Sequence, residues 1–232
     1  MSEEAELEEV VHVARREAAP FVLIAAAADL ALAGLSAWHG WQLYSPSDWW
    51  IWIVLALPAA LLALVFGLGF GRMGVSNDHR RSVAIALLTV LAVANLVAVG
   101  LVLVSLTGGG SAMTGVQLLA TATVVLVVNV ITFALVFWET DCGGPVARAL
   151  ATKRVAPDFQ FPQDENPELA DASWAPGLED YLYIAFTNSI AFSPTDAMPL
   201  THRAKMFMSF EATVAAVTLL IVAARAVNTL QG

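Results

Sequence analysis

The stretch TGVQLLATATVVLVVNVITFALVFW, residues 114–138, contains no charged side chain. A transmembrane helix needs about 20 predominantly apolar residues, so this stretch is long enough to cross a bilayer. Four further runs meet the same requirement, at residues 20–39, 49–70, 82–106 and 204–228. The sequence therefore predicts an all-α fold, a polytopic membrane helical bundle with about five transmembrane helices.

The overall composition agrees with a membrane protein. Hydrophobic residues make up 58% of the 232-residue chain and charged residues 13%, against about 25% charged residues in ordinary soluble domains. The formal net charge of −9 comes mostly from two acidic segments, residues 3–17 and 158–180. Binding to nucleic acid requires clustered Lys and Arg. The composition therefore indicates a single membrane domain whose first partner is the lipid bilayer, and it argues against a nucleic-acid partner.

Three longer segments lie outside the five runs. Residues 1–19 interleave Glu with apolar residues, which predicts an amphipathic cytoplasmic N-terminal segment. Residues 139–180 form a polar acidic loop. The apolar segment at 181–192 is too short to span a bilayer, so it is a re-entrant half-helix, an interfacial helix or a buried packing helix. With the turn that follows, it makes a pore-like unit at residues 181–199.

The basic residues predict the orientation in the membrane. Lys and Arg are enriched in cytoplasmic loops. If the N-terminus is cytoplasmic, every Lys and Arg except Arg225 falls on that side. We therefore expect the N-terminus and the loop at 139–205 to be cytoplasmic and the C-terminus to lie outside.

Polar side chains inside the predicted spans are the best functional candidates, because burying them in a membrane is costly. From the cytoplasmic end of their helices, Asp29, Asn129 and Glu211 lie about 10–14 Å deep and Asn95 about 20 Å. Such a layer could hold a cation or relay protons, or the groups could simply bond neighbouring helices together. Two further polar residues, Arg225 and Asn228, lie near the end of the last span.

The motifs of soluble enzymes are missing from the sequence. It has no Gly-rich phosphate loop, no nucleophile elbow and no paired-His metal signature. The single cysteine, Cys142, excludes an intramolecular disulfide and a multi-Cys metal site. We therefore expect no enzymatic activity, no cofactor and no metal centre.

Residues 180–199, DYLYIAFTNSIAFSPTDAMP, precede the last apolar helix. This segment resembles the pore module of tetrameric potassium channels, in which a short pore helix, a filter strand, an acidic residue and a proline precede the inner helix. Asp196 and Pro199 match the acidic residue and the proline, with the same spacing. With the apolar helix that follows, the resemblance covers residues 180–230, about a fifth of the chain. It implies that the ion pathway involves Thr187, Phe192, Ser193, Thr195, Asp196 and Glu211.

The central motif of that resemblance departs from the family pattern. The stretch that corresponds to the filter, Ile190–Thr195, has no glycine and contains Pro194. Filter carbonyls point into the pore as rings, which requires an accessible backbone. The resemblance therefore does not imply potassium selectivity.

A second resemblance is closer. Asp180–Thr187, the Thr195-Asp196 pair and the end at 224–228 are similar to an uncharacterised family of bacterial multi-pass membrane proteins. These proteins carry a DYLYxAFT segment, a Ser/Thr-Asp turn and a final apolar helix. The resemblance implies the plasma membrane of a bacterium and supplies no function.

Two hypotheses follow for the function. The first is a channel-like homo-oligomer that conducts monovalent cations through a pore built from residues 114–138, 181–199 and 204–228. The alternative is a non-conducting membrane scaffold, partner subunit or lipid-binding bundle. The missing filter glycines favour the second hypothesis, and the carboxylates inside the spans favour the first.

Overall fold

The chain folds as an all-α bundle, and the computed structural model describes residues 3–41, 49–68, 77–107, 114–151, 155–171, 174–193 and 196–230. The helices are α1 (Glu3–His39), α2 (Trp49–Leu68), α3 (Asn77–Thr107), α4 (Gly115–Thr140), α5 (Pro145–Ala149), α6 (Pro162–Glu165), α7 (Leu178–Ala191) and α8 (His202–Leu230). Single 3-10 turns lie at Asp141–Gly143 and Pro167–Leu169, and two short strands are β1 (Phe159–Gln160) and β2 (Met198–Pro199).

Four helices in the described parts of the chain are long and apolar enough to cross a membrane. Their apolar stretches are Leu7–His39, Arg81–Val104, Gly115–Ala149 and His202–Arg225. The predicted span at 49–70 corresponds to α2, whose described apolar stretch, Trp50–Leu64, is shorter. The helical bundle predicted from the sequence is thus confirmed.

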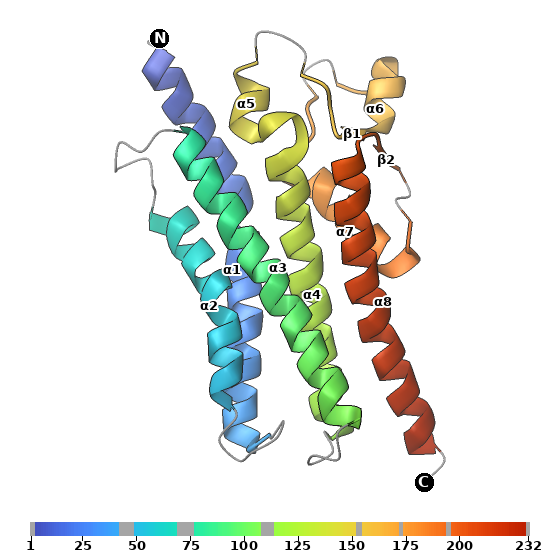
Figure 1. The fold of residues 1–232 in the computed structure, drawn as a ribbon. Helices are drawn as coiled ribbons and strands as arrows, with labels where there is room; N and C mark the ends of the chain where they lie inside the picture. The colour runs from blue at the N-terminus through green and yellow to red at the C-terminus, as the bar shows by residue number, and fades with distance from the viewer. Residues whose placement is uncertain are drawn as a thin grey trace.

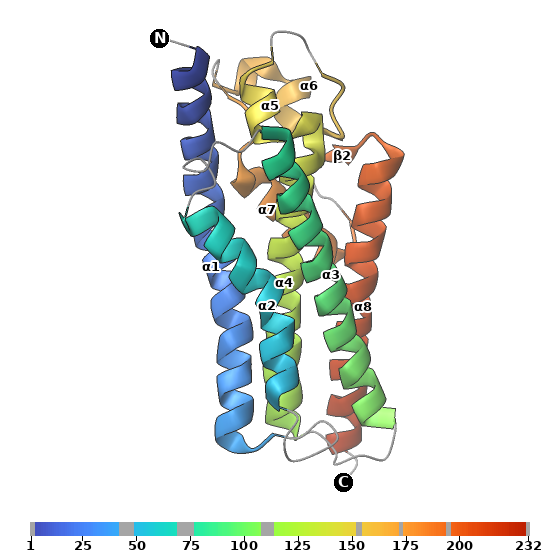
Figure 2. The same ribbon diagram turned by 60° about the vertical axis from the view of Figure 1, so that its left-hand side comes forward.

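The long helices run side by side and alternate in direction (Figure 1). The N-terminus, α5, α6 and both strands lie at one end of the bundle, and the C-terminus lies at the other (Figures 1 and 2). We call the first of these the N-terminal end. The helix α4 is the central element, because it packs against α1, α3, α7 and α8. Its buried residues continue along almost its whole length, which explains why its sequence is apolar on every face.

The first helix continues through the boundary that the sequence predicts near residue 19. Pro20 lies inside α1, where it removes one backbone hydrogen bond. Ala14 and Ala18 before the proline, and Val22 and Ala25 after it, are all buried in the same core cluster. Packing on both sides of Pro20 therefore holds residues 3–19 and the first span as one helix.

The helix α7 is a half-length element that packs against α4 and α8. Tyr181, Ile184 and Asn188 are buried, whereas Phe186 and Ile190 are exposed. The chain then returns to the N-terminal end, where β2 pairs with β1 in antiparallel register. Of the three interpretations of residues 181–192, the buried packing helix and the re-entrant half-helix both describe this geometry.

The described parts of the segment 139–180 fold into short helices and a strand. Aromatic side chains explain why, because Phe159 and Phe161 are buried and each packs on the ring of Tyr181. Trp174 in turn packs edge-on against Phe161. Each of these rings buries a large apolar area, so aromatic packing joins this acidic segment to the core of the bundle.

Candidate functional site

Glu211 is the centre of a polar cluster between the helices. It is fully buried on α8, about 13 Å along the helix from its start. Its Oε2 accepts a hydrogen bond from Asn188 Nδ2 at 2.7 Å, and its Oε1 accepts one from Ser189 Oγ at 3.0 Å. Both donors come from α7. A carboxylate can accept about four hydrogen bonds, so these two side-chain donors leave capacity for a proton or a cation.

Asn129 of α4 joins this carboxyl group to the centre of the bundle. Its Nδ2 donates to the main-chain carbonyl of Glu211 at 3.2 Å and to Ser189 Oγ at 3.5 Å. Its Oδ1 accepts from Asn95 Nδ2 of α3 at 3.3 Å. We call Asn95, Asn129, Asn188, Ser189 and Glu211 the intramembrane polar cluster. It connects four helices, and every member is buried.

Asp29 of α1 lies near Asn95 of the cluster. Asp29 and Asn95 both line a small cavity of about 10 Å³ that lies between α1, α2, α3 and α4. A cavity of this size is just large enough to hold one water molecule. The structure therefore brings the two intramembrane carboxyl groups, Asp29 and Glu211, to opposite ends of one row of polar groups.

Polar groups also continue from the cluster toward the C-terminus along α4 and α8. Thr218 follows Glu211 by seven residues and Arg225 follows by seven more, so the three lie on one face of α8. Thr218 and Thr121 of α4 line a second cavity of about 10 Å³. The hydroxyl of Thr121 is buried and has no hydrogen-bond partner in the described parts of the chain. Buried hydroxyls are normally paired, so this cavity offers a partner site for water.

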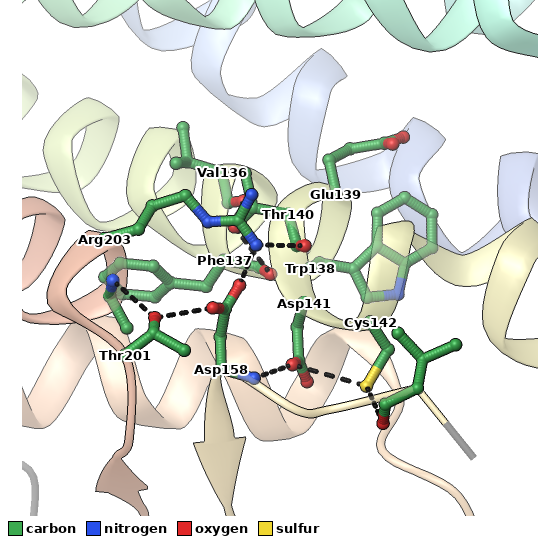
Figure 3. Close-up of polar contacts among 12 residues, drawn as sticks. Val136, Phe137, Trp138, Glu139, Thr140, Asp141, Cys142, Asp158, Thr201 and Arg203 are labelled. Carbon is green, nitrogen blue, oxygen red and sulfur yellow. Dashed lines mark hydrogen bonds and ion pairs between the residues drawn. The ribbon is translucent and has the colours of Figure 1, made fainter.

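A second polar cluster closes the N-terminal end of the bundle, where Asp158 lies between Arg203 and Thr201 on one side and Asp141 on the other (Figure 3). Arg203 forms an ion pair with Asp158 and donates to the main-chain carbonyl of Thr140 at 3.0 Å. Thr201 Oγ1 donates to Asp158 Oδ1 at 2.5 Å. The start of α8 is thus bonded to the end of α4 through the segment that carries β1.

The same cluster also fixes the start of α7. The Asp141 carboxylate accepts from the Asp158 backbone N–H at 2.6 Å and from the Tyr181 hydroxyl at 2.5 Å. Burial raises the pKa of the Tyr181 phenol, which keeps its proton and acts as the donor. Arg148 lies over the Tyr181 ring, 5.3 Å from its centroid. We call Thr140, Asp141, Asp158, Tyr181, Thr201 and Arg203 the cap cluster.

The predicted pathway residues of the segment 181–199 occupy different environments. Thr187 is buried, and its hydroxyl donates to the main-chain carbonyls of Tyr183 and Ile184 in its own helix. Phe192, which caps α7 in a left-handed conformation with φ of 56°, is exposed, as are Ser193 and Asp196. These residues are therefore not gathered around Glu211.

Two of the predicted polar residues have side chains outside the described part of the structure. Thr195 lies outside the described residues, and Asn228 lies in α8 with its side chain outside the described part. Arg225 is half-buried near the end of the same helix.

Sequence reasoning missed the two α7 residues that bond to Glu211. Asn188 follows Tyr181 by seven residues and Ile184 by four, a spacing that places all three on one helical face. This signal was present in the sequence. The cap cluster carried no such signal, because Asp141, Asp158 and Arg203 are far apart in the chain and meet only in the fold.

Within the described residues, no group of three or more His, Cys, Asp and Glu side chains is placed to hold a metal ion. Comparisons with protein families, with curated proteins and with solved structures find no match to this chain. The resemblances to potassium-channel pore modules and to the bacterial multi-pass family therefore stay predictions.

Proposed function

We propose that the chain is an integral membrane protein that conducts protons or small monovalent cations, with Glu211 as the carboxyl group of the pathway. The observation that supports this proposal is the intramembrane polar cluster, in which a fully buried carboxyl group has two side-chain donors. Ionisable residues inside a membrane are costly and commonly mark ion pathways or proton relays. The carboxyl group is the member of this cluster that can take up and release a proton.

The pathway that we propose runs within one chain, between α4, α7 and α8. Toward the C-terminus it passes the cavity between Thr121 and Thr218, where the unpaired Thr121 hydroxyl can bind a water molecule. The row from Asn129 through Asn95 to Asp29 is a lateral branch that can accept a proton. Backbone carbonyls and hydroxyls supply the oxygen atoms that a hydrated ion or a proton needs on this route.

A pore shared by several chains is the other form of this proposal. A homo-oligomer would place the 181–199 segments around a common axis, with Thr187, Phe192, Ser193, Thr195 and Asp196 near it. The exposed face of α7 carries Tyr183, Phe186 and Ile190. In a shared pore these side chains would give cations a mostly apolar lining, which does not replace their hydration shell. The pathway within one chain therefore fits the described side chains better than the shared pore does.

A non-conducting scaffold, partner subunit or lipid-binding bundle is the second candidate function. It is favoured by the number of hydrogen bonds inside the intramembrane polar cluster, because a bonded network of this kind can also serve only to hold helices together. The two candidates differ in one measurable quantity, the ion flux through the purified protein.

The deciding experiment is flux in liposomes. The protein is reconstituted with a pH-sensitive dye inside the vesicles, and a potassium gradient with valinomycin sets the membrane potential. We expect proton flux in the wild type, little flux in Glu211→Gln, and partial flux in Glu211→Asp, which keeps an ionisable group. Vesicles without valinomycin, loaded with a sodium-sensitive or a potassium-sensitive dye, test the cations.

Two control variants separate the possible pathways. Thr213→Val is two residues from Glu211 on α8 and removes an exposed hydroxyl that bonds only within its own helix, so its flux should equal that of the wild type. Asp196→Asn should reduce flux only if the shared pore is correct. Equal flux in the wild type and Glu211→Gln would overturn the role of Glu211. A wild type without any flux would favour the non-conducting bundle.

We also propose the plasma membrane of a bacterium as the location, with the N-terminal end of the bundle in the cytoplasm. The bacterial location is supported by the resemblance of residues 180–187 to the bacterial multi-pass family, and the orientation by the distribution of Lys and Arg, since all of them except Arg225 belong to that end by sequence.

A further inference from the structure

A groove of about 860 Å³ runs along the outside of the bundle between α3 and α8, with α4 as its floor. The helices α3 and α8 are separated at the N-terminal end and approach each other toward the C-terminus (Figure 2). On α8 the groove extends from His202 to Thr213, which is about 16 Å along the helix. The hydrocarbon core of a bilayer is about 30 Å thick, so the groove belongs to one leaflet.

The side chains that form the groove accept only an apolar occupant along its length. Its walls and floor include Ile85 and Val93 of α3, Phe133 and Val136 of α4, and Met206 and Phe210 of α8. The hydroxyls of Thr89, Ser209 and Thr213 also line it, and each donates to a main-chain carbonyl four residues earlier in its own helix. These hydroxyl protons are therefore used, and a polar ligand would find no free donor there.

Positive charge is found only at the N-terminal end of the groove. Lys205, in the first turn of α8, is exposed and lines the groove beside His202. The neighbouring cations have other partners, because Arg203 pairs with Asp158 and Arg81 donates to the main-chain carbonyl of Glu139. In the described part of the chain, Lys205 and His202 form no ion pair with a carboxylate, and no carboxylate lines the groove.

We propose that this groove binds one anionic phospholipid, with an acyl chain between α3 and α8 and the phosphate beside Lys205 and His202. The charge and the apolar lining are complementary to the two parts of such a lipid. The end of the groove with the cations is also the end that the basic residues place in the cytoplasm, where the leaflet surface is anionic. This proposal is independent of ion conduction, since none of the groove residues named here belongs to the intramembrane polar cluster.

The test is binding of phosphatidylglycerol against phosphatidylcholine with identical acyl chains. The full-length protein is stripped of lipid in a mild non-ionic detergent, and lipid binding is measured by native mass spectrometry. We expect one phosphatidylglycerol to bind more tightly than phosphatidylcholine. Lys205→Ala should weaken phosphatidylglycerol binding by about fivefold, because one basic residue at the surface contributes about that factor. Phosphatidylcholine binding should change little.

Three further variants keep the result interpretable. Lys205→Arg keeps the charge and should keep the preference. Arg16→Ala removes an exposed cation at the same end, on α1, and should have no effect. Ala92→Phe adds a ring inside the groove and should weaken the binding of both lipids. Equal binding of the two lipids to the wild type, or an unchanged preference in Lys205→Ala, would overturn the proposal. So would a dimer that covers α3 and α8 and excludes lipid.

Discussion

Tyr181 at the start of α7 donates a hydrogen bond of 2.5 Å to Asp141 directly after α4. Both residues are buried. The carboxylate also accepts from the backbone of Asp158, so one side chain joins the end of α4 to the strand segment and to α7. The position of α7, and with it the position of the donors to Glu211, depends on this contact.

Removing the Tyr181 hydroxyl should therefore destabilise the protein. Tyr181→Phe leaves a buried carboxylate oxygen without its donor, and hydrogen bonds to charged groups contribute about 1.5–3 kcal/mol. We expect a loss of this size in unfolding by SDS titration of the detergent-solubilised protein. Tyr183→Phe is the matched control, because Tyr183 is exposed on the same helix. An equal loss in both variants would contradict the role of the contact.

The Arg203–Asp158 ion pair should couple the start of α8 to the strand β1. The Arg203 side chain is half-exposed and that of Asp158 is buried, so solvent screens the pair in part. We expect Arg203→Met to cost about 1–3 kcal/mol, mostly because Asp158 stays buried without its cation. A double-mutant cycle with Asp158→Asn should give a coupling of about 0.5–3 kcal/mol. Additive effects would mean that the pair contributes no stability.

Asn188 and Glu211 should show strong coupling inside the bundle. Asn188 Nδ2 donates to Glu211 Oε2 and also to the main-chain carbonyl of Met208 at 2.9 Å. Asn188→Leu should cost about 1–3 kcal/mol, because two buried acceptors lose their donor. Adding Glu211→Leu should recover part of that loss, since it removes one of these acceptors. If the double variant is less stable than the sum of the single effects predicts, this account of the cluster is wrong.

A side chain at position 144 should destabilise the folded protein. Its φ is +97°, and an added Cβ would lie 3.1 Å from the main-chain oxygen of Glu139. Gly144→Ala should cost about 1–3 kcal/mol, because it combines backbone strain with a close contact. Gly100 in α3 has nothing within 4 Å of an added Cβ, so Gly100→Ala should be neutral or stabilising by about 0.5–1 kcal/mol. Thermal unfolding of both variants in detergent compares them directly.

The proposed orientation predicts which cysteines a membrane-impermeant reagent labels. In a Cys142→Ala background, Asp171→Cys lies on an exposed residue at the N-terminal end and Gly115→Cys on an exposed residue at the start of α4, at the opposite end. In intact cells we expect the reagent to label position 115 and to label position 171 only after lysis. Labelling of position 171 in intact cells would reverse the orientation.

The sequence predicted the long helices well because length and apolar composition determine them directly. The run at 114–138 became α4, and the run at 204–228 became most of α8. It also identified Asn129 and Glu211 as members of one layer, because depth along a helix follows from counting residues. Hydropathy gave no information about the rotation of each helix, which determines the neighbours of each polar group.

The remaining features depend on contacts between distant residues. The resemblance to channel pores put Asp196 and Glu211 in one ion pathway, whereas the structure places Asp196 on the surface just before β2. The difference arises because the chain turns back at Phe192 and returns to the end from which it came. Likewise, the acidic composition of the segment 139–180 did not predict that Phe159 and Phe161 are buried. Their aromatic partner, Tyr181, lies in a later helix.

The short length of α7 has a consequence for how the protein is made. With 14 residues, this helix is too short to enter a bilayer as an independent span, and its buried Asn188 and Ser189 have their partner on α8, which is synthesised later. We therefore expect α7 to remain at the membrane surface during synthesis. It should pack against α4 and α8 last, after both have been inserted.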